Sequence, residues 1–234
     1  MSGTVVDNFE NGIFWELYSD LERQFQNFLE YVPYLPENEK TISFKLLNLI
    51  LSIGGHVDSA FKEMARYPKF SGNNDCREIL EKIERKETIP ITLPLKAFET
   101  EYKLSEKTVK FKRLPERQNI TPFKPRSSGA QSPLWWKIYN GIKHDVALNL
   151  RDVTLQNTRD ALAGAFLLNV LHKPAKVRFL NLGVLRVVVA RGAEYVYRMT
   201  LEEFENAVEE AKDDQTIQAK LETPLFIYDY VQRE

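Results

Sequence analysis

Apolar side chains recur every three or four residues over much of the chain, which is the period of an amphipathic helix. Prolines interrupt the pattern between successive stretches, and Pro36 is expected near the first turn of the second one. Within that second stretch, Gly54 and Gly55 mark a kink or a close contact, because glycine destabilises a helix interior. The helices predicted in the first half lie at 9–29, 37–67 and 77–86.

Two further helices are predicted in the second half. One begins at Pro133, a favoured first-turn residue, and is expected to end near Leu148. The next is capped by Asp152 or Thr154 and runs to His172. Its central run ALAGA consists mostly of small residues, so a neighbouring helix can approach closely.

The segment 88–132 has a different character, with five prolines and no clear helical period. Short alternating pieces at 89–93 and 108–112 predict strands. A loop of this length is uncommon inside a compact domain, so the segment is expected to contain strands or to be functional.

The C-terminal part mixes strands with one acidic helix. Pro174 ends the preceding helix. Thr200 and Glu203 match a capping box, which predicts a helix that runs to Lys212. A turn at 191–193 joins the first two predicted strands into a hairpin. The strands are expected at 184–190, 194–199 and 225–230.

These elements predict a mainly α fold: an up-and-down helical bundle with minor β elements, namely a β-containing insertion and a C-terminal hairpin. The bundle spans 1–175, with the insertion at about 88–132. The hairpin, acidic helix and final strand of 176–234 are expected to pack on it.

Composition narrows the class of protein further. A chain of 234 residues can bury roughly 70% of its unfolded surface, so it needs no disulfide or metal to fold. Cys76 is the only cysteine and no Cys/His cluster has zinc spacing, so we expect neither a metal nor a cofactor. The start lacks a signal-peptide pattern, and the longest apolar run, 161–171, is half a membrane span. We therefore expect a cytoplasmic protein without a membrane partner.

The net charge of −1 hides an asymmetry. The stretch 107–126 carries seven Lys or Arg and one Glu, whereas 201–222 carries eight acidic residues and two Lys. The basic stretch either follows a phosphate backbone or is a solvated loop. Its candidate nucleic-acid contacts are Lys110, Lys112, Arg113 and Arg117.

The stretch WWKIYNGIKHD, residues 135–145, combines an apolar and a polar helix face. At 100° per residue, His144 projects away from the apolar stripe, with Asn140 one turn and Lys137 two turns before it. Trp136 and Lys143 flank that polar line. Either the face is a site, or it is a solvated surface whose terminal cations suit the helix dipole. The apolar stripe consists of Trp135, Ile138, Tyr139, Ile142 and Val146.

This stretch, followed by the small-residue helix NTRDALAGAFLLNVL, resembles the HEPN superfamily of prokaryotic helical bundles, over 133–171. The resemblance implies a dimerising bundle, and many family members are metal-independent ribonucleases in defence and toxin–antitoxin systems. The family signature is an Arg, a polar residue, three more residues and a His. Asn140 and His144 match the last two conserved positions, but the arginine position falls on Tyr139. A looser family spacing would place Lys137 there.

Cleavage of RNA without a metal uses the ribose 2′-OH as nucleophile. The resemblance therefore implies His144 as acid and base, Asn140 as the orienting residue and Lys137 or Lys143 as the phosphate contact. Arg151 could add charge across a dimer interface. Trp135 and Trp136 are expected to be mainly core and interface anchors, with base stacking as the alternative for Trp136.

Two alternatives remain open. The first is a non-catalytic binder of nucleic acid or nucleotide, which uses the His/Asn face and the basic stretch. The second is a dimeric protein-interaction module, whose polar face or acidic helix meets a protein partner such as an antitoxin. The other two histidines, His56 and His172, are expected to be packed or at a helix end rather than to bind a ligand.

Overall fold

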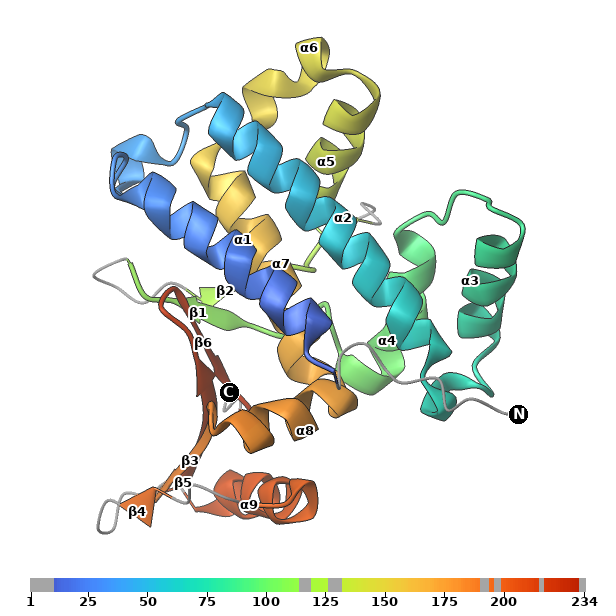
Figure 1. Cartoon of the computed structure of the whole chain (residues 1–234), viewed down its shortest axis with the longest axis vertical. Coiled ribbons are helices and arrows are strands. Elements are labelled where there is room, and N and C mark those ends of the chain that lie inside the picture. Colours follow the sequence, from blue (N-terminus) through green and yellow to red (C-terminus); the bar gives the residue numbers. More distant parts are fainter. Residues whose placement is uncertain are drawn as a thin grey trace.

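The structure is a computed structural model that describes residues 11–113, 119–125, 132–189, 194–195, 199–214 and 217–231. Helices dominate it, and a twisted sheet lies beside the bundle (Figure 1). The predicted mainly α class with minor β elements is therefore confirmed. The helices are α1 (Ile13–Leu29), α2 (Phe44–Arg66), α3 (Asn74–Glu84), α4 (Thr92–Tyr102), α5 (Leu134–His144), α6 (Val146–Asn149), α7 (Leu155–Leu171), α8 (Lys173–Leu182) and α9 (Leu201–Asp213), with 3-10 turns η1 (Pro36–Asn38), η2 (Pro68–Phe70) and η3 (Leu150–Asp152). The strands are β1 (Val109–Phe111), β2 (Asn119–Ile120), β3 (Leu185–Val189), β4 (Glu194–Tyr195), β5 (Ile217–Glu222) and β6 (Phe226–Asp229).

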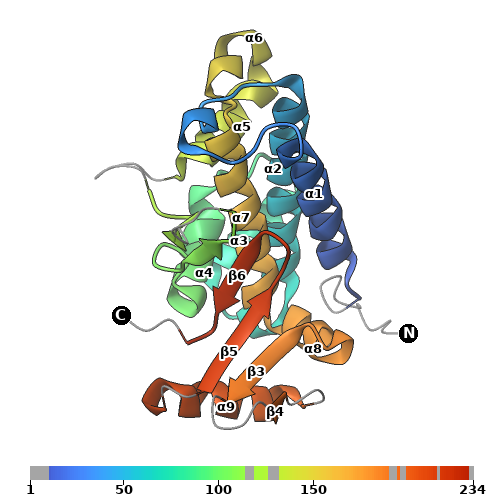
Figure 2. The ribbon, with the colours of Figure 1, turned by 90° about the vertical axis from the view of Figure 1, so that its left-hand side faces the viewer.

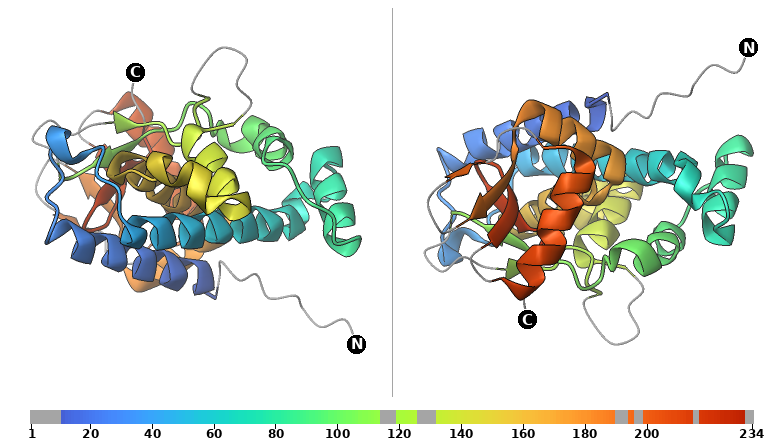
Figure 3. Two further views of the ribbon diagram at one scale, coloured as in Figure 1. Left: turned by 90° about the horizontal axis from the view of Figure 1, so that it is seen from above. Right: turned by 90° about the horizontal axis from the view of Figure 1, so that it is seen from below.

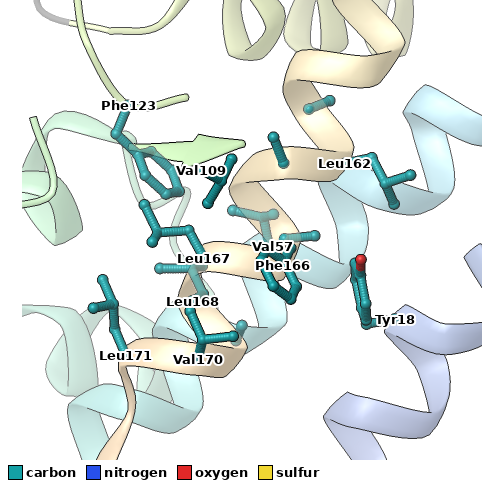
Figure 4. Packing of buried hydrophobic residues seen from close by; sticks show 14 of the residues in the cluster. Tyr18, Val57, Val109, Phe123, Leu162, Phe166, Leu167, Leu168, Val170 and Leu171 are labelled. Atoms are coloured by element: carbon teal, nitrogen blue, oxygen red, sulfur yellow. The ribbon is translucent and has the colours of Figure 1, made fainter. Parts of the chain in front are cut away.

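Helix α7 is the centre of the bundle and packs against α1, α2 and α5. It is apolar on nearly all sides, as expected of a helix surrounded by others, and every side chain from Ala161 to Leu171 is buried. Figure 4 shows the side chain of Phe166 beside Tyr18 of α1, and the two ring centroids lie 5.6 Å apart. Helix α7 is thus enclosed by the other bundle helices.

Two predictions in the first half were wrong. Helix α2 begins at Phe44 rather than near residue 37, because the Ser43 side chain accepts the Leu46 N–H (3.1 Å) and caps it. No strand forms at the predicted 89–93; this segment leads into α4, which begins at Thr92 and whose buried residues follow helical spacing. Pro94 lies in the first turn of α4, where proline costs no helical hydrogen bond. These buried residues are Leu93, Pro94, Ala97, Phe98 and Tyr102.

One helix end in the second half also differs from the prediction. Helix α5 stops at His144, not near Leu148, because Asp145 is extended and its carboxylate caps α6 by accepting the Leu148 N–H (3.1 Å). Helix α7 ends at Leu171, close to the predicted end at His172. Pro174 follows that end but lies in the first turn of α8, an element that the sequence pattern did not predict.

The strands form one six-stranded sheet in the order β2-β1-β6-β5-β3-β4 (Figure 2). Each described pair is antiparallel, including β3 with β4, where Val189 pairs with Glu194. The predicted hairpin pairing is therefore present, while its turn lies outside the described residues. Strand β5 was not predicted, and β1 of the insertion pairs with β6 of the tail, with Phe111 opposite Phe226. Two β regions that are distant in sequence thus share one sheet.

The C-terminal part packs on the bundle through this sheet. The ring of Phe226 on β6 stacks on Phe166 of α7, with centroids 5.6 Å apart. Helix α9 packs on β5 and contacts α8, and it starts with the predicted capping box of Thr200 and Glu203. Figure 3 shows α9 along one end of the sheet and α3 and α4 to one side of the bundle. A single apolar cluster therefore joins the residues before and after position 175.

Candidate functional site

Helix α5 is anchored by aromatic side chains. Trp135 is buried, and its indole N–H donates to the carbonyl of Pro122 (2.7 Å). The same ring lies against Gly164 of α7, where a Cβ atom would be 3.0 Å from it. The small residues predicted to allow a close helix approach therefore do so at this contact.

Tyr139 occupies the position at which the resemblance expects an arginine. Its ring lies directly on Gly54 of α2, where a Cβ atom would be 2.2 Å from the ring. Tyr139 is only 6% exposed, and the side chain closes the contact between α2 and α5. This position is therefore part of the core and presents no cation.

Trp136 and Val146 depart from the positions that the helical wheel gave them, although burial of Trp136 agrees with its expected role as a core anchor. Trp136 is buried, and its ring packs against Trp135 and Tyr139, so it is not available to stack on a base. Because α5 packs against both α2 and α7, the buried arc is wider than one stripe. Val146 is exposed rather than buried, since the helix breaks at Asp145.

The polar face of α5 has the predicted orientation. His144 and Lys137 are exposed, Asn140 is half-buried, and all three lie off the apolar face. Within the described residues, the side chain of His144 makes no hydrogen bond or ion pair. Lys143 is exposed as well, with Nζ 5.8 Å from the centroid of the Tyr139 ring. The imidazole is thus free to meet a ligand, while its predicted catalytic role stays a prediction.

A groove of about 750 Å³ lies beside this face, between α5 and the start of α7. It brings the two candidate cations Lys137 and Arg151 together within one chain, which was not predicted, and adds Lys40 from the segment before α2. The backbone pairing of Ile42 with Thr154 places that segment alongside the start of α7. We call this the α5–α7 groove; it is lined by Lys40, Ile42, Leu134, Lys137, Ile138, Gly141, Asn149, Arg151, Asp152, Thr154, Gln156 and Asn157.

The charges of the α5–α7 groove suit an anion. Three of its lining residues are cationic and one, Asp152, is acidic. The N-terminus of α7 adds little, although helix N-termini often bind anions, because its first N–H groups already have acceptors. These acceptors are Thr41 O for Leu155 (2.9 Å), Glu39 O for Gln156 (3.0 Å) and Thr154 Oγ1 for Asn157 (3.2 Å). An anion in the groove would therefore be held by side chains.

The α5–α7 groove contains one candidate to replace the arginine that the resemblance expects at position 139. Arg151 is exposed there. Arg159 of α7 is buried and engaged, since it bonds Asp160 (2.7 Å) and its guanidinium lies 5.1 Å from the Tyr34 ring centroid. His144, Asn140 and Lys143 do not line the groove.

The predicted basic stretch forms a separate surface at β1. Lys110 is half-buried on this strand, and Lys112 forms an ion pair with Glu222 and donates to the carbonyl of Thr223 (3.1 Å). Lys112 therefore stabilises the sheet and is not a free cation. Arg113 is exposed in a smaller groove of about 340 Å³ beside the end of α1, and Arg117 lies outside the described residues.

Sequence reasoning did not find Lys40, Asn149 or Gln156 as residues of the groove. Lys40 is about 100 positions away in sequence from the other cations, and no local pattern links it to α5. The only sequence signal for Asn149 is Gly141, which lies next to it in the folded chain and whose missing side chain makes room for the asparagine.

The other two histidines are buried, as expected of packed residues. Asn169 donates from Nδ2 to Nε2 of His56 (3.3 Å), and Nδ1 of His172 lies 3.2 Å from the Tyr102 hydroxyl. In the part of the chain that the structure describes, no three His, Cys, Asp or Glu side chains are grouped so that they could hold a metal ion. No helix there has the length and apolar character to cross a membrane.

Comparison with known proteins identified no relative of this chain. No family model, no curated protein and no solved structure matches the chain. The resemblance to the HEPN superfamily therefore depends on the residues of 133–171 alone.

Proposed function

We propose that this chain is a HEPN-like, RNA-directed protein that binds RNA phosphates in the α5–α7 groove. The observation that carries the proposal is the convergence of Lys40, Lys137 and Arg151, from three separate segments, on one groove. Cations gathered in this way attract a phosphate backbone, and the guanidinium of Arg151 can bind two phosphate oxygens at once.

Binding can be measured by fluorescence anisotropy with labelled single-stranded RNA at several salt concentrations. We expect Lys137→Gln and Arg151→Gln each to weaken binding severalfold. Each should also reduce the slope of log affinity against log salt by about 0.7, the value for one lost phosphate contact on a single strand.

Two controls identify the surface that binds. Arg77→Gln, at an exposed position on α3, should leave affinity and slope unchanged. Arg113→Gln tests the β1 surface and is also expected to have no effect. Salt-independent affinity, or a loss confined to Arg113→Gln, would refute binding in the α5–α7 groove.

A second candidate function is metal-independent RNA cleavage by the adjoining face of α5. It is favoured by the exposure of His144 one helical turn after Asn140, on a face turned away from the core. A histidine can accept the proton of the ribose 2′-OH, and the half-buried amide of Asn140 can orient that hydroxyl. The negative charge that develops on the phosphate would then be stabilised by Lys137 or Arg151.

Cleavage can be tested with single-stranded RNA in EDTA. We expect His144→Ala to abolish the activity and Asn140→Ala to reduce it, while anisotropy shows nearly unchanged RNA binding, because neither residue lines the groove. Equal cleavage by the wild-type protein and His144→Ala would exclude this chemistry. Intact RNA with retained binding would leave only the binding function.

A further inference from the structure

Arg151 belongs to a short connection between two bundle helices. The connection consists of α6 and η3 and contains only seven residues, Val146–Asp152. Elements this short have little stability of their own, because helix nucleation is costly. Something outside the connection must therefore fix where the guanidinium of Arg151 lies.

The side chain of Asn149 ties one end of the connection to α5. Its Nδ2 atom donates to the carbonyl of Gly141 (3.1 Å) and to that of Asp145 (2.8 Å). The Gly141 carbonyl lies in the last turn of α5, where it also accepts the N–H of the C-cap residue Asp145 (2.8 Å). A Cβ atom at Gly141 would lie 2.7 Å from Oδ1 of Asn149, so this approach requires a glycine.

The side chain of Asn157 ties the other end to α7. Its Nδ2 donates to the carbonyl of Asp152 (2.8 Å), which also accepts the N–H of Thr154 (2.9 Å). Arg151 therefore lies between these two contacts. It follows Asn149 by two residues and directly precedes Asp152, whose carbonyl accepts from Asn157. Both asparagines line the α5–α7 groove.

We propose that Asn149 and Asn157 are positioning residues that hold Arg151 at the α5–α7 groove, so that it can bind a phosphate of RNA. This inference depends on the proposed binding function. The two amides fix the backbone on both sides of Arg151, and the order that they impose lowers the entropy lost when the guanidinium binds.

The test is a pair of double-mutant cycles on RNA affinity and its salt slope. We expect Asn149→Ala and Asn157→Ala each to weaken binding three- to tenfold, with a slope reduced by up to about 0.7. In the Arg151→Gln background, neither substitution should weaken binding further, because the residue they position is gone. A direct contact of either asparagine with RNA would persist in that background.

Asn73→Ala is the matched control, since Asn73 is also half-buried and donates from Nδ2 to a backbone carbonyl (Ala97, 3.0 Å) but lies between α3 and α4 and does not line the groove. It should bind RNA like the wild type. Thermal unfolding identifies any variant that has lost its fold, and the two asparagines provide independent variants if one fails.

The outcomes separate the two proposals. If the wild-type protein does not bind RNA, the proposed function fails and this inference fails with it. If Arg151→Gln weakens binding but the asparagine variants behave like the wild type, only the positioning role is overturned. The same holds if the asparagine substitutions weaken binding equally with and without Arg151.

Discussion

Gly54 and Gly55 are neighbours on α2 but have different surroundings. The ring of Tyr139 lies on Gly54, whereas nothing lies within 4 Å of a Cβ atom built on Gly55. One glycine is therefore required by packing and the other only lowers helix stability.

We expect opposite effects from replacing these two glycines with alanine. Gly54→Ala forces the Tyr139 ring away and should lower the free energy of unfolding by about 1–3 kcal/mol. Gly55→Ala should raise it by up to about 1 kcal/mol, the difference in helix propensity between the two residues. Chemical denaturation measures both, and a stable Gly54→Ala variant would contradict the close contact.

His56 makes stability depend on pH. Burial lowers the pKa of this imidazole from 6.5 to about 4, and Nε2 accepts the hydrogen bond from Asn169, so protonation is disfavoured in the folded protein. The unfolded chain binds the proton more readily than the folded protein. The contribution of neutral His56 to the free energy of unfolding is therefore complete above pH 6.5 and is lost as the pH falls towards 4.

The measurement compares urea unfolding of the wild type and His56→Gln from pH 7.5 to 4. Over this range the free energy of unfolding of the wild type should fall by roughly 3 kcal/mol more than that of the variant, as expected for a pKa lowered by two to three pH units. The comparison cancels the titration of the carboxyl groups common to both proteins. Parallel pH profiles would show that His56 is not buried as described.

At the scale of elements, the turn between β5 and β6 is attached to α1 through one buried carboxylate. Oε1 of Glu22 accepts hydrogen bonds from the Thr223 hydroxyl and from the N–H of Leu225 (3.1 Å). Burial nevertheless raises the pKa of Glu22, because the loss of hydration outweighs these hydrogen bonds and the charge of Lys112.

Substitution of Glu22 should separate the charge from the hydrogen bonds. The raised pKa means that ionised Glu22 costs stability at neutral pH, and that this cost disappears as the pH falls through the pKa of the folded state. Glu22→Gln should therefore be more stable than the wild type at pH 7, with a difference that shrinks towards pH 4.5. Glu22→Ala should be about 1–3 kcal/mol less stable, because it leaves the buried Leu225 N–H without an acceptor. Denaturation at both pH values distinguishes these outcomes.

At the scale of the molecule, the two basic surfaces predicted from the sequence lie apart. Helices α5 and α6 lie at one end of the long axis, and β1 lies lower, within the sheet (Figure 1). The acidic helix α9 lies at the opposite end from α6. This separation is why we assign phosphate binding to the α5–α7 groove rather than to one continuous basic surface.

The sequence by itself determined the long helices and the orientation of His144. Helical periodicity and capping residues are local, so they identified α1, α7, α9 and the polar face of α5. The same local reasoning failed where a contact distant in sequence decides the structure. Strand β5 forms because β3 and β6 pair with it, and α8 has Pro174 in its first turn, although we expected this proline only to end the preceding helix.

Only the tertiary structure decided which charges share a site. Lys40 reaches Lys137 and Arg151 because Ile42 pairs with Thr154, and such a contact leaves no periodic signal in the sequence. Likewise, Trp136 is buried because α5 packs against two helices at once, which no single helical wheel can reveal. Periodicity specifies the face of a helix, but the partner of that face depends on the packing of the whole chain.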